Sequence, residues 1–512
     1  MKINWYLILF ASILCNRSFS QTIFGLDPSF GSGGKVFLNP GTGDDYGQEV
    51  ALQSDGKIIL VGSAIISGDK DFVVVRLNTN GSLDATFGGD GIVTTDFNNF
   101  DDAAHSVVIQ PDGKIVVGGE ASTAMGPDFA VARYNIDGSL DNTFSGNGKV
   151  TADFDNDWDY GISMALQADG KIVLGGYRYE MTTDYDFALA RFTTDGVLDN
   201  TFSSDGKTTT DFGFFQDYIS EIAIQPDGKI VASGFGISGV TYFEDFCIAR
   251  YNVSGSLDAS FGTGGKVMTE VAAYSDECWA MALQPDGKIL IGGFSDTSPD
   301  EKMAVLRYNP DGTLDSSFDG DGVALLTLMG LAPAAQRIFV KSDGKILIAG
   351  SIYNGSNDDF FLLQLNDDGT PDISFDGDGV YSCSVGTGDD MPLDIDLQPD
   401  GKIVLSGFTD SGSDKEMTIA RFMYGNVSSE ENTSLNFNVY PNPTNGKFNV
   451  QFDNYISEGR IKISDLSGKK IFESEALNGS QFEINLENPV SGLCICEIHT
   501  EGKVFYQKII LE

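Results

Sequence analysis

Histidine is almost absent from this chain of 512 residues, which holds only His105 and His499. Catalytic triads with a histidine base and histidine-rich metal centres both depend on such side chains. The sequence also shows no glycine-rich phosphate loop and no nucleophile elbow in a suitable context. These absences weaken the case for an enzyme that uses histidine or binds nucleotide phosphates.

Cysteine is scarce as well, with six residues in the whole chain. Cys15 lies in an apolar N-terminal stretch. The other five, an odd number with irregular spacing, are Cys247, Cys278, Cys383, Cys494 and Cys496. This pattern predicts neither a disulfide framework nor a zinc site.

Basic residues are few, since 32 lysines and arginines stand against 74 aspartates and glutamates, a net charge of −42. A surface this acidic repels nucleic-acid phosphates, so we expect no nucleic-acid partner. It suits a solvated extracellular surface and leaves calcium as the cofactor to consider.

Long apolar runs are missing except near the N-terminus. Trp5–Cys15 is too short to span a bilayer, follows Lys2 and precedes small residues at Ser18-Phe-Ser20. Residues 1–20 are therefore expected to be a secretory signal peptide. Its removal would move the net charge from −42 to −44, because it takes two basic residues and no acid. No other stretch predicts a transmembrane segment.

Glycine, with 61 residues, is abundant and periodic. The phrase Gln110-Pro-Asp-Gly-Lys-Ile115 recurs in variant form at intervals of 57 to 59 residues. Asp-Gly between two apolar runs predicts a β-hairpin, because glycine tolerates positive φ. The hairpin glycines, which we expect to be structural, are Gly56, Gly113, Gly170, Gly228, Gly287, Gly344 and Gly401.

Two further landmarks complete each repeat. In the first full unit they are Asp71-Phe-Val-Val-Val-Arg76 and Leu83-Asp-Ala-Thr-Phe87. The apolar runs predict four strands in this unit, at residues 49–53, 57–63, 72–77 and 92–97. Four antiparallel strands in each repeat of this length are typical of β-propeller blades.

The phase of the repeats predicts a closed ring. The array opens with half a unit at residues 26–39 and ends with the other half at residues 393–423. An N-terminal strand can therefore complete the last blade and remove the exposed sheet edges. We predict an all-β fold with a seven-bladed β-propeller over residues 21–427. An open solenoid, the alternative, would gain nothing from matched half-units.

The repeat ends at a polar linker, residues 428–434. Residues 435–512 alternate apolar and polar side chains in short runs such as Phe448–Phe452 and Arg460–Ser464. Such runs predict a small β-sandwich.

These repeats resemble the delta-60 repeat in all three landmarks, over about residues 26–423. The tail resembles the C-terminal sorting domain of type IX (Por) secretion cargo at Val439-Tyr-Pro-Asn-Pro-Thr-Asn-Gly446, Ile463-Ser-Asp-Leu-Ser-Gly-Lys469 and Gln507-Lys-Ile-Ile-Leu511. This second resemblance implies a Bacteroidetes-type cell, passage through the periplasm and recognition by the type IX secretion machinery. It implies a secreted or outer-membrane-surface location and removal of the tail on maturation. Cys494 departs from the tyrosine common in such tails.

One arginine and one aspartate recur in nearly every repeat, as Arg76 and Asp84 do in the first full unit. Site residues rarely appear in every copy of a repeat, so we expect a structural ion pair. The sixth unit carries Gln364 in place of the arginine.

A second set of acids lies eleven residues before the hairpin glycines. It comprises Asp45, Asp102, Asp159, Asp217, Asp276 and Asp390, and the sixth unit has Pro333 instead. Two interpretations stay open. Each carboxylate caps its own loop by accepting backbone N–H groups, or the set forms a ring of carboxylates that binds calcium or a cationic ligand.

Length changes among the repeats fall between the second and third strands. Units three and four gain residues there, in aromatic loops that share a face with the aspartates. The candidate ligand-binding residues on this face are Trp158, Tyr160, Tyr177, Tyr179, Tyr185, Phe215, Tyr218, Tyr242 and Phe243. Exposed rings beside carboxylates suit a saccharide or a peptide. Packing of the same rings over blade edges is the alternative.

The sequence as a whole favours a binding protein over an enzyme. We expect a secreted or cell-surface propeller that acts as a binding or adhesion module for a glycan or protein ligand and is exported through its tail. The alternative is a carbohydrate-active, glycosidase-like enzyme with a carboxylate pair on the loop face.

Overall fold

The computed structural model describes residues 25–511 apart from 182–183, 214, 238–241, 299–300, 329–332, 424–436, 443, 466–468, 475–476, 487–491 and 501–502. One compact unit spans residues 21–425 and another contains residues 426–512. The expected signal peptide and linker lie outside the described residues.

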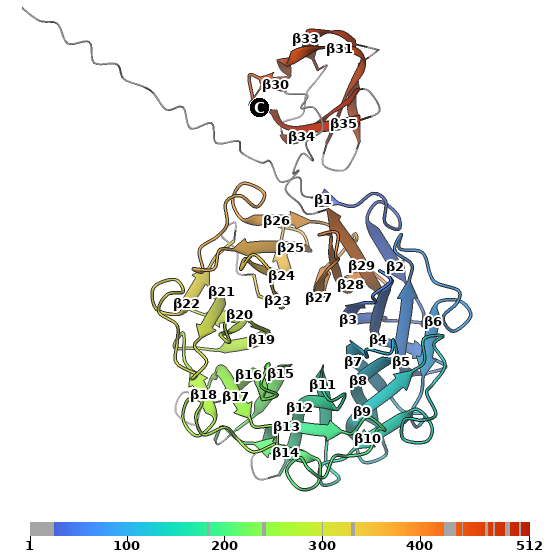
Figure 1. The fold of residues 1–512 in the computed structure, drawn as a ribbon, viewed down its shortest axis with the longest axis vertical. Helices are drawn as coiled ribbons and strands as arrows, with labels where there is room; N and C mark the ends of the chain where they lie inside the picture. Colours follow the sequence, from blue (N-terminus) through green and yellow to red (C-terminus); the bar gives the residue numbers. More distant parts are fainter. Residues whose placement is uncertain are drawn as a thin grey trace, which may run out of the picture. The chain divides into compact units, whose positions relative to one another are not determined.

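The first unit consists of antiparallel sheets in which strands follow one another in chain order (Figure 1). Blade one contains β3 (Tyr46–Leu52), β4 (Ile58–Ile66), β5 (Asp69–Leu77) and β6 (Ile92–Thr95). Blade two contains β7 (Asp102–Ile109), β8 (Ile115–Ser122), β9 (Pro127–Tyr134) and β10 (Lys149–Ala152). Blade three contains β11 (Asp159–Leu166), β12 (Ile172–Glu180), β13 (Asp184–Phe192) and β14 (Lys207–Thr210). The four strands expected in the first full unit are thus present.

The later blades repeat this order. Blade four contains β15 (Asp217–Ile224), β16 (Ile230–Ile237), β17 (Glu244–Tyr251) and β18 (Lys266–Thr269). Blade five contains β19 (Asp276–Leu283), β20 (Ile289–Asp296), β21 (Glu301–Tyr308) and β22 (Val323–Leu326). Blade six contains β23 (Arg337–Val340), β24 (Ile346–Tyr353), β25 (Asp358–Leu365) and β26 (Val380–Cys383). In Figure 1 the first strand of each blade lies nearest the centre of the ring.

The seventh blade closes the ring as the half-units predict. It contains β27 (Asp390–Leu397), β28 (Ile403–Asp410) and β29 (Lys415–Met423). Its outer edge is completed from the N-terminal end by β2 (Lys35–Leu38) and β1 (Gly25–Leu26), which both pair antiparallel with β29. The predicted all-β propeller is therefore confirmed.

The apolar core of the propeller lies between neighbouring blades. Ile59 and Phe72 of blade one, for example, pack in one buried cluster with Val107 and Val117 of blade two. Phe87, from the Leu-Asp-x-x-Phe landmark, is fully buried in the same cluster. Each blade thus buries its apolar faces against its neighbours, which makes the ring cooperative.

The second unit is a small all-β body. It contains β30 (Phe437–Tyr440), β31 (Lys447–Asp465), β32 (Lys470–Glu473), β33 (Leu477–Asn485), β34 (Gly492–Thr500) and β35 (Lys503–Leu511). The runs at 448–452 and 460–464, expected as two strands, form the single strand β31, which pairs with β33 through its first part and with β34 through its second. Cys494 and Cys496 are buried in the core of this unit.

Candidate functional site

The two faces of the propeller carry different connections. The hairpins between first and second strands and the connections between third and fourth strands form what we call the turn face. The connections between second and third strands, and those from one blade to the next, form the loop face. The antiparallel order of strands within each blade dictates this division.

The repeated arginine and aspartate lie on the turn face and form a buried ion pair in six blades. In blade three, Arg191 Nε donates to Asp199 Oδ2 at 2.9 Å, and Nη1 donates to the carbonyl oxygen of Val253 in blade four at 2.5 Å. Burial alone would raise the pKa of Asp199, but hydrogen bonds from Thr201 and Lys171 and the charge of Arg191 hold it at about 2. The expected ion pair is confirmed, and in these six blades its arginine also bonds to a carbonyl oxygen of the next blade.

Blade six keeps the same cluster with its cation moved. Gln364 donates to Asp372 Oδ2 at 2.6 Å, while Lys341 Nζ lies 3.4 Å from Gln364 Oε1. In blade three the amide is Gln167, whose Oε1 lies 3.4 Å from Arg191 Nη1. Amide and cation have therefore exchanged positions, and the polar contact survives.

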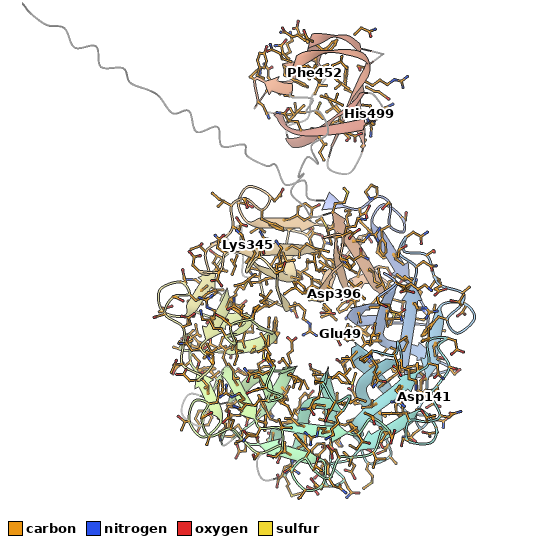
Figure 2. The ribbon with its side chains drawn as sticks, viewed as in Figure 1. Glu49, Asp141, Lys345, Asp396, Phe452 and His499 are labelled. Carbon is orange, nitrogen blue, oxygen red and sulfur yellow. The ribbon has the colours of Figure 1, made fainter. Side chains whose placement is uncertain are left out.

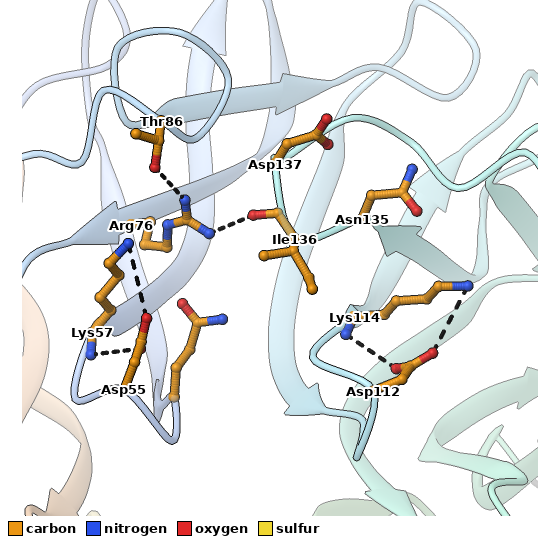
Figure 3. Close-up of a pocket in the computed structure, with 10 residues that line it drawn as sticks. Asp55, Lys57, Arg76, Thr86, Asp112, Lys114, Asn135, Ile136 and Asp137 are labelled. Atoms are coloured by element: carbon orange, nitrogen blue, oxygen red, sulfur yellow. Dashed lines mark hydrogen bonds and ion pairs between the residues drawn. The ribbon is translucent and has the colours of Figure 1, made fainter.

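A cavity of about 480 Å³ opens on the turn face between blades one and two (Figure 3). Its lining includes Lys57, Arg76 and Lys114. Lys57 and Arg76 both contact Asp84, at 2.8 and 2.7 Å, and Lys114 contacts Asp141 at 2.9 Å. The three cations are thus already paired with aspartates of the repeats, so we interpret the cavity as a gap between two packed blades and not as a ligand site.

The inner strands carry a belt of hydrogen bonds around the ring. A β-bulge between Gly47 and Glu49 accompanies a contact in which Glu49 accepts the backbone N–H of Val107 in blade two at 2.6 Å. Figure 2 labels Glu49 at the inner edge of the ring. Equivalent contacts join Ser106 to Met164, Ser163 to Ile222, Glu221 to Met281 and, across the closure, Asp394 to Val50.

Arg337 is the counter-ion of this belt. Its Nε lies 3.2 Å from Asp394 Oδ1, and its Nη1 lies 3.5 Å from Glu221 Oε2. The pKa of Glu49 is raised mainly by burial and further by the negative charge of Asp394. Burial also raises the pKa of Glu221, to about 7. Such shifts also mark catalytic acids. Here the two glutamates accept backbone N–H groups of neighbouring blades, so their first role is to hold the ring closed.

The six predicted aspartates all lie on the loop face and are at most 1 % exposed. Five accept the backbone N–H of the residue five positions earlier, as Asp102 Oδ2 does from Phe97 at 2.7 Å. Asp45 Oδ2 accepts from Gly41 at 3.3 Å. Loop capping thus accounts for one oxygen of each carboxylate.

The second carboxylate oxygen differs among the six. Asp390 Oδ1 accepts from Gly386 N at 2.8 Å and from Thr409 Oγ1 at 2.5 Å. The Oδ1 atoms of the other five are buried without a hydrogen-bond partner, namely those of Asp45, Asp102, Asp159, Asp217 and Asp276. Capping leaves these five oxygens unexplained.

Three of these aspartates belong to acidic triads. The triads are Asp71, Asp96 and Asp102; Asp128, Asp153 and Asp159; and Asp186, Asp211 and Asp217, and one carboxylate oxygen from each member lies within 4.8 Å of the others. Burial, together with the charges of the neighbouring acids, raises the pKa of Asp102 to about 7 and those of Asp159 and Asp217 to about 8. Asp101, adjacent to Asp102 in sequence, instead accepts from the backbone N–H of Lys70 at 2.9 Å.

Five of the candidate aromatic residues pack against one another between blades three and four. Tyr160, Tyr177, Tyr179, Tyr185 and Tyr218 form a chain of half-buried rings with neighbouring centroids 4.8–5.5 Å apart. Phe235 extends the chain, 5.2 Å from Tyr218. These rings bury much of their surface against one another and support the loop face above them. We call the five tyrosines and Phe235 the aromatic base.

The other four candidates are more exposed. Trp158 is 50 % exposed and Tyr242 67 %, while Phe215 and Phe243 are 37 % and 36 % exposed. Phe215 lies 5.5 Å from Tyr242, and Phe243 lies 5.4 Å from Tyr274, a ring that the sequence analysis did not select. We call Trp158, Phe215, Tyr242, Phe243 and Tyr274 the aromatic arc. It extends over blades three to five.

The sequence analysis did not predict that several of these side chains lie at the site. The triad partners Asp71, Asp128 and Asp186 come from third strands, and Asp96, Asp153 and Asp211 follow fourth strands. Their spacings of 57 and 58 residues match those of the hairpin glycines and could have revealed them. The belt residues show the same signal, from Glu49 to Ser106 and Ser163.

Comparison with family models identifies both parts of the chain. The model described as a domain of unknown function (DUF5122) beta-propeller matches residues 53–87, 110–144, 167–202, 225–261, 284–318 and 341–375. The secretion system C-terminal sorting domain matches residues 438–512. No curated protein matches the chain by sequence.

Similar solved structures are distant. They include a catalytically inactive virginiamycin B lyase from Staphylococcus aureus with quinupristin, at 12 % identity over 75 % of this chain and 98 % of that one, with a TM-score of 0.44. The β-propeller domain of the Trilobed protease from Pyrococcus furiosus has 12 % identity over 76 % and 97 %, with a TM-score of 0.40. Matches this remote say nothing about ligand or activity.

The sorting domain indicates secretion to the cell surface or beyond, and interaction with the secretion machinery. Within the described residues, no helix is long and apolar enough to cross a bilayer. The chain thus carries DUF5122 β-propeller repeats followed by the C-terminal sorting domain of type IX (Por) secretion cargo.

Proposed function

We propose that the propeller is a binding module for saccharide chains outside the cell and that the aromatic arc is its binding surface. The observation that carries this proposal is the run of exposed rings, from Trp158 to Tyr274, on the face where the repeats vary in length. A soluble protein exposes large rings at a cost unless a partner covers them. The sorting domain supports the location, since exported cargo meets polysaccharides at the cell surface.

The chemistry of the arc favours a saccharide without acidic groups. Aromatic faces stack on the apolar faces of sugar rings, and carboxylates accept hydrogen bonds from sugar hydroxyls. The net charge of −42 opposes any acidic polymer through long-range repulsion. A neutral polysaccharide therefore fits this surface best.

The test is native affinity electrophoresis of the full chain through gels that contain mannan, xyloglucan or hydroxyethylcellulose. We expect one of these polymers to slow the chain, and Trp158→Ala or Tyr242→Ala to weaken the retardation about tenfold, as the loss of one stacked ring allows. Tyr353→Ala is the matched control, because Tyr353 is 49 % exposed at the end of β24 in blade six, away from the arc.

Equal mobility in all gels, or retardation unchanged by both arc substitutions, would overturn the proposal. The glycosidase-like alternative has its own signature. Release of reducing ends from a retained polymer, abolished by one Asp→Asn substitution on the loop face, would assign an enzyme in place of a binding module.

A further inference from the structure

The three acidic triads share one architecture. In each, the first aspartate lies in the third strand of a blade, the second directly follows its fourth strand, and the third begins the next blade: Asp71, Asp96 and Asp102 lie in β5, after β6 and in β7. Each triad therefore bridges two consecutive blades, from blade one to blade four. A site made of three strands that are fixed by the sheets is pre-organised.

Unpartnered oxygens point to a missing ligand. Asp102 and Asp217 are at most 1 % exposed, and each keeps an Oδ1 that no hydrogen bond reaches. An isolated buried carboxylate oxygen costs free energy unless a donor or cation satisfies it. Two further carboxylates lie beside it in each triad, so three like charges gather within 4.8 Å. The second aspartate of each triad also accepts one backbone N–H, as Asp96 Oδ1 does from Asn99 at 2.6 Å, which leaves the Oδ1 of the third without a donor.

The junction between blades six and seven shows what a satisfied version looks like. Asp390 occupies the position of Asp102, but Thr409 on the paired strand donates to its Oδ1 at 2.5 Å. Opposite Asp102 and Asp217 the paired residues are Ala121 and Gly236, which have no side-chain donor. The position of Asp96 is taken there by Ser384. At this junction the donor is present and the second acid is absent.

The junction between blades five and six has lost all three acids together. Lys302, Thr327 and Pro333 stand where the first unit has Asp71, Asp96 and Asp102. Independent loop caps would be lost one at a time. A joint loss, with an ammonium group in place of one carboxylate, is what a shared ligand would produce.

The basic groups near the triads leave the carboxylates available. Lys149, Lys207 and Lys266 each donate to the backbone carbonyl of the second aspartate, at 2.6, 2.7 and 2.8 Å. Arg178, paired across from Asp159, directs Nη1 to Asp155 at 2.8 Å and Nη2 to Glu180. These contacts tie loops together and do not neutralise the three-carboxylate point.

We propose that each triad binds one calcium ion, so that the chain carries three calcium clamps between its first four blades. All-oxygen, carboxylate-rich donors are the ligands of hard cations, and calcium tolerates the varied geometry that loops provide. The clamps also steady the aromatic base, because Tyr160 and Tyr218 directly follow Asp159 and Asp217. The proposal stands independently of any saccharide.

The experiment is calorimetric titration of CaCl₂ into the chelator-treated full chain at about pH 7.5, up to about ten times the 10⁻⁴–10⁻³ M dissociation constants of extracellular calcium modules. We expect three sites. Asp96→Asn, Asp153→Asn and Asp211→Asn should each remove one site, and the triple substitution should remove all three. Asp390→Asn is the matched control, which should leave the stoichiometry at three.

Thermal unfolding supplies a second readout, which distinguishes the loss of a calcium site from a general folding defect. Asp217→Asn should raise the melting temperature in chelator, because the amide relieves carboxylate repulsion, and should reduce the gain that calcium gives. A purely structural cap predicts a fall in both media. Absence of calcium binding to the wild-type chain, or three sites in the triple variant, would overturn the proposal.

Discussion

Both faces of the propeller bury aspartates, but the side chains that surround these carboxylates have opposite effects on their pKa. On the turn face a buried aspartate such as Asp199 meets an arginine, a lysine and a hydroxyl, and its pKa falls to about 2. On the loop face a buried aspartate such as Asp217 meets two more acids, and burial together with their charges raises its pKa to about 8. The first environment stabilises the ring by itself, whereas the second is complete only with a cation.

Repetition separates scaffold from function in this chain. The turn-face cluster recurs in every blade, and even blade six preserves it by exchanging Arg and Gln for Gln364 and Lys341. The loop face changes from blade to blade in length, in aromatic content and in its acids. A uniform face that locks the blades together leaves the other face free to vary.

The largest effect should follow from breaking the turn-face cluster. Arg191→Ala leaves Asp199 buried without its main counter-ion and removes the contact to blade four, so we expect a loss of about 3–5 kcal/mol in unfolding free energy. Gln364→Ala removes a hydrogen bond without a formal charge and should cost about 1–3 kcal/mol. Urea unfolding of both variants measures the difference, and equal losses would contradict the comparison.

The next effect is the pH dependence of the calcium-free chain. Folding raises the pKa of Asp102 to about 7 and those of Asp159 and Asp217 to about 8, so the folded chain holds more protons than the unfolded chain between about pH 4 and 8. Stability from these groups is therefore fully present below about pH 4 and is lost progressively as the pH rises to about 8. We expect the melting temperature in chelator to fall over this range and calcium to restore it. A flat profile in chelator would show that the acids do not titrate in this way.

A smaller change is expected from the aromatic base. Tyr177→Ala removes a ring that contacts Tyr160, Tyr185 and Tyr218 at 5.0, 5.5 and 4.8 Å. Each such ring pair contributes about 0.5–1.5 kcal/mol, so saccharide retention should weaken through loss of support and stability should fall by about 3 kcal/mol at most. If retention is lost while stability is unchanged, Tyr177 contacts the ligand itself.

The smallest effect should come from Thr409→Ala in blade seven. This substitution removes one donor to Asp390 Oδ1, which keeps the N–H of Gly386 at 2.8 Å. We expect a loss of about 1–2 kcal/mol, measured by urea unfolding, and no calcium site in exchange, because Ser384 replaces the second acid. A gain of a fourth calcium site would show that two carboxylates suffice.

The sequence predicted the fold because each landmark is local. Hairpin glycines such as Gly113, with φ of 86°, and the matched half-units determine strand number, order and closure without any long-range contact. The aspartates of the loop face were also predicted from their spacing, and most rings of the arc from the length changes among the repeats. The triad partners were not, because Asp71, Asp96 and Asp102 come from two blades and meet only once the blades pack.

The belt around the inner strands escaped for a related reason. A bulge in six of the first strands sets which residue faces the next blade, and nothing in the sequence marks the bulge between Gly161 and Ser163. Tyr274 was not predicted as a ligand-binding residue because it is a single aromatic residue before its strand, whereas Tyr177 and Tyr242 lie in loops with several aromatic residues.

Hydrogen–deuterium exchange on the full chain, with and without calcium and the retained polysaccharide, tests the division of labour between the two faces most directly. The account predicts stronger protection in the loop-face segments 96–102 and 153–159, which carry the triads and Trp158, and unchanged exchange in the turn-face hairpins 53–57 and 110–114. Protection confined to the turn-face hairpins, or no change anywhere, would contradict it.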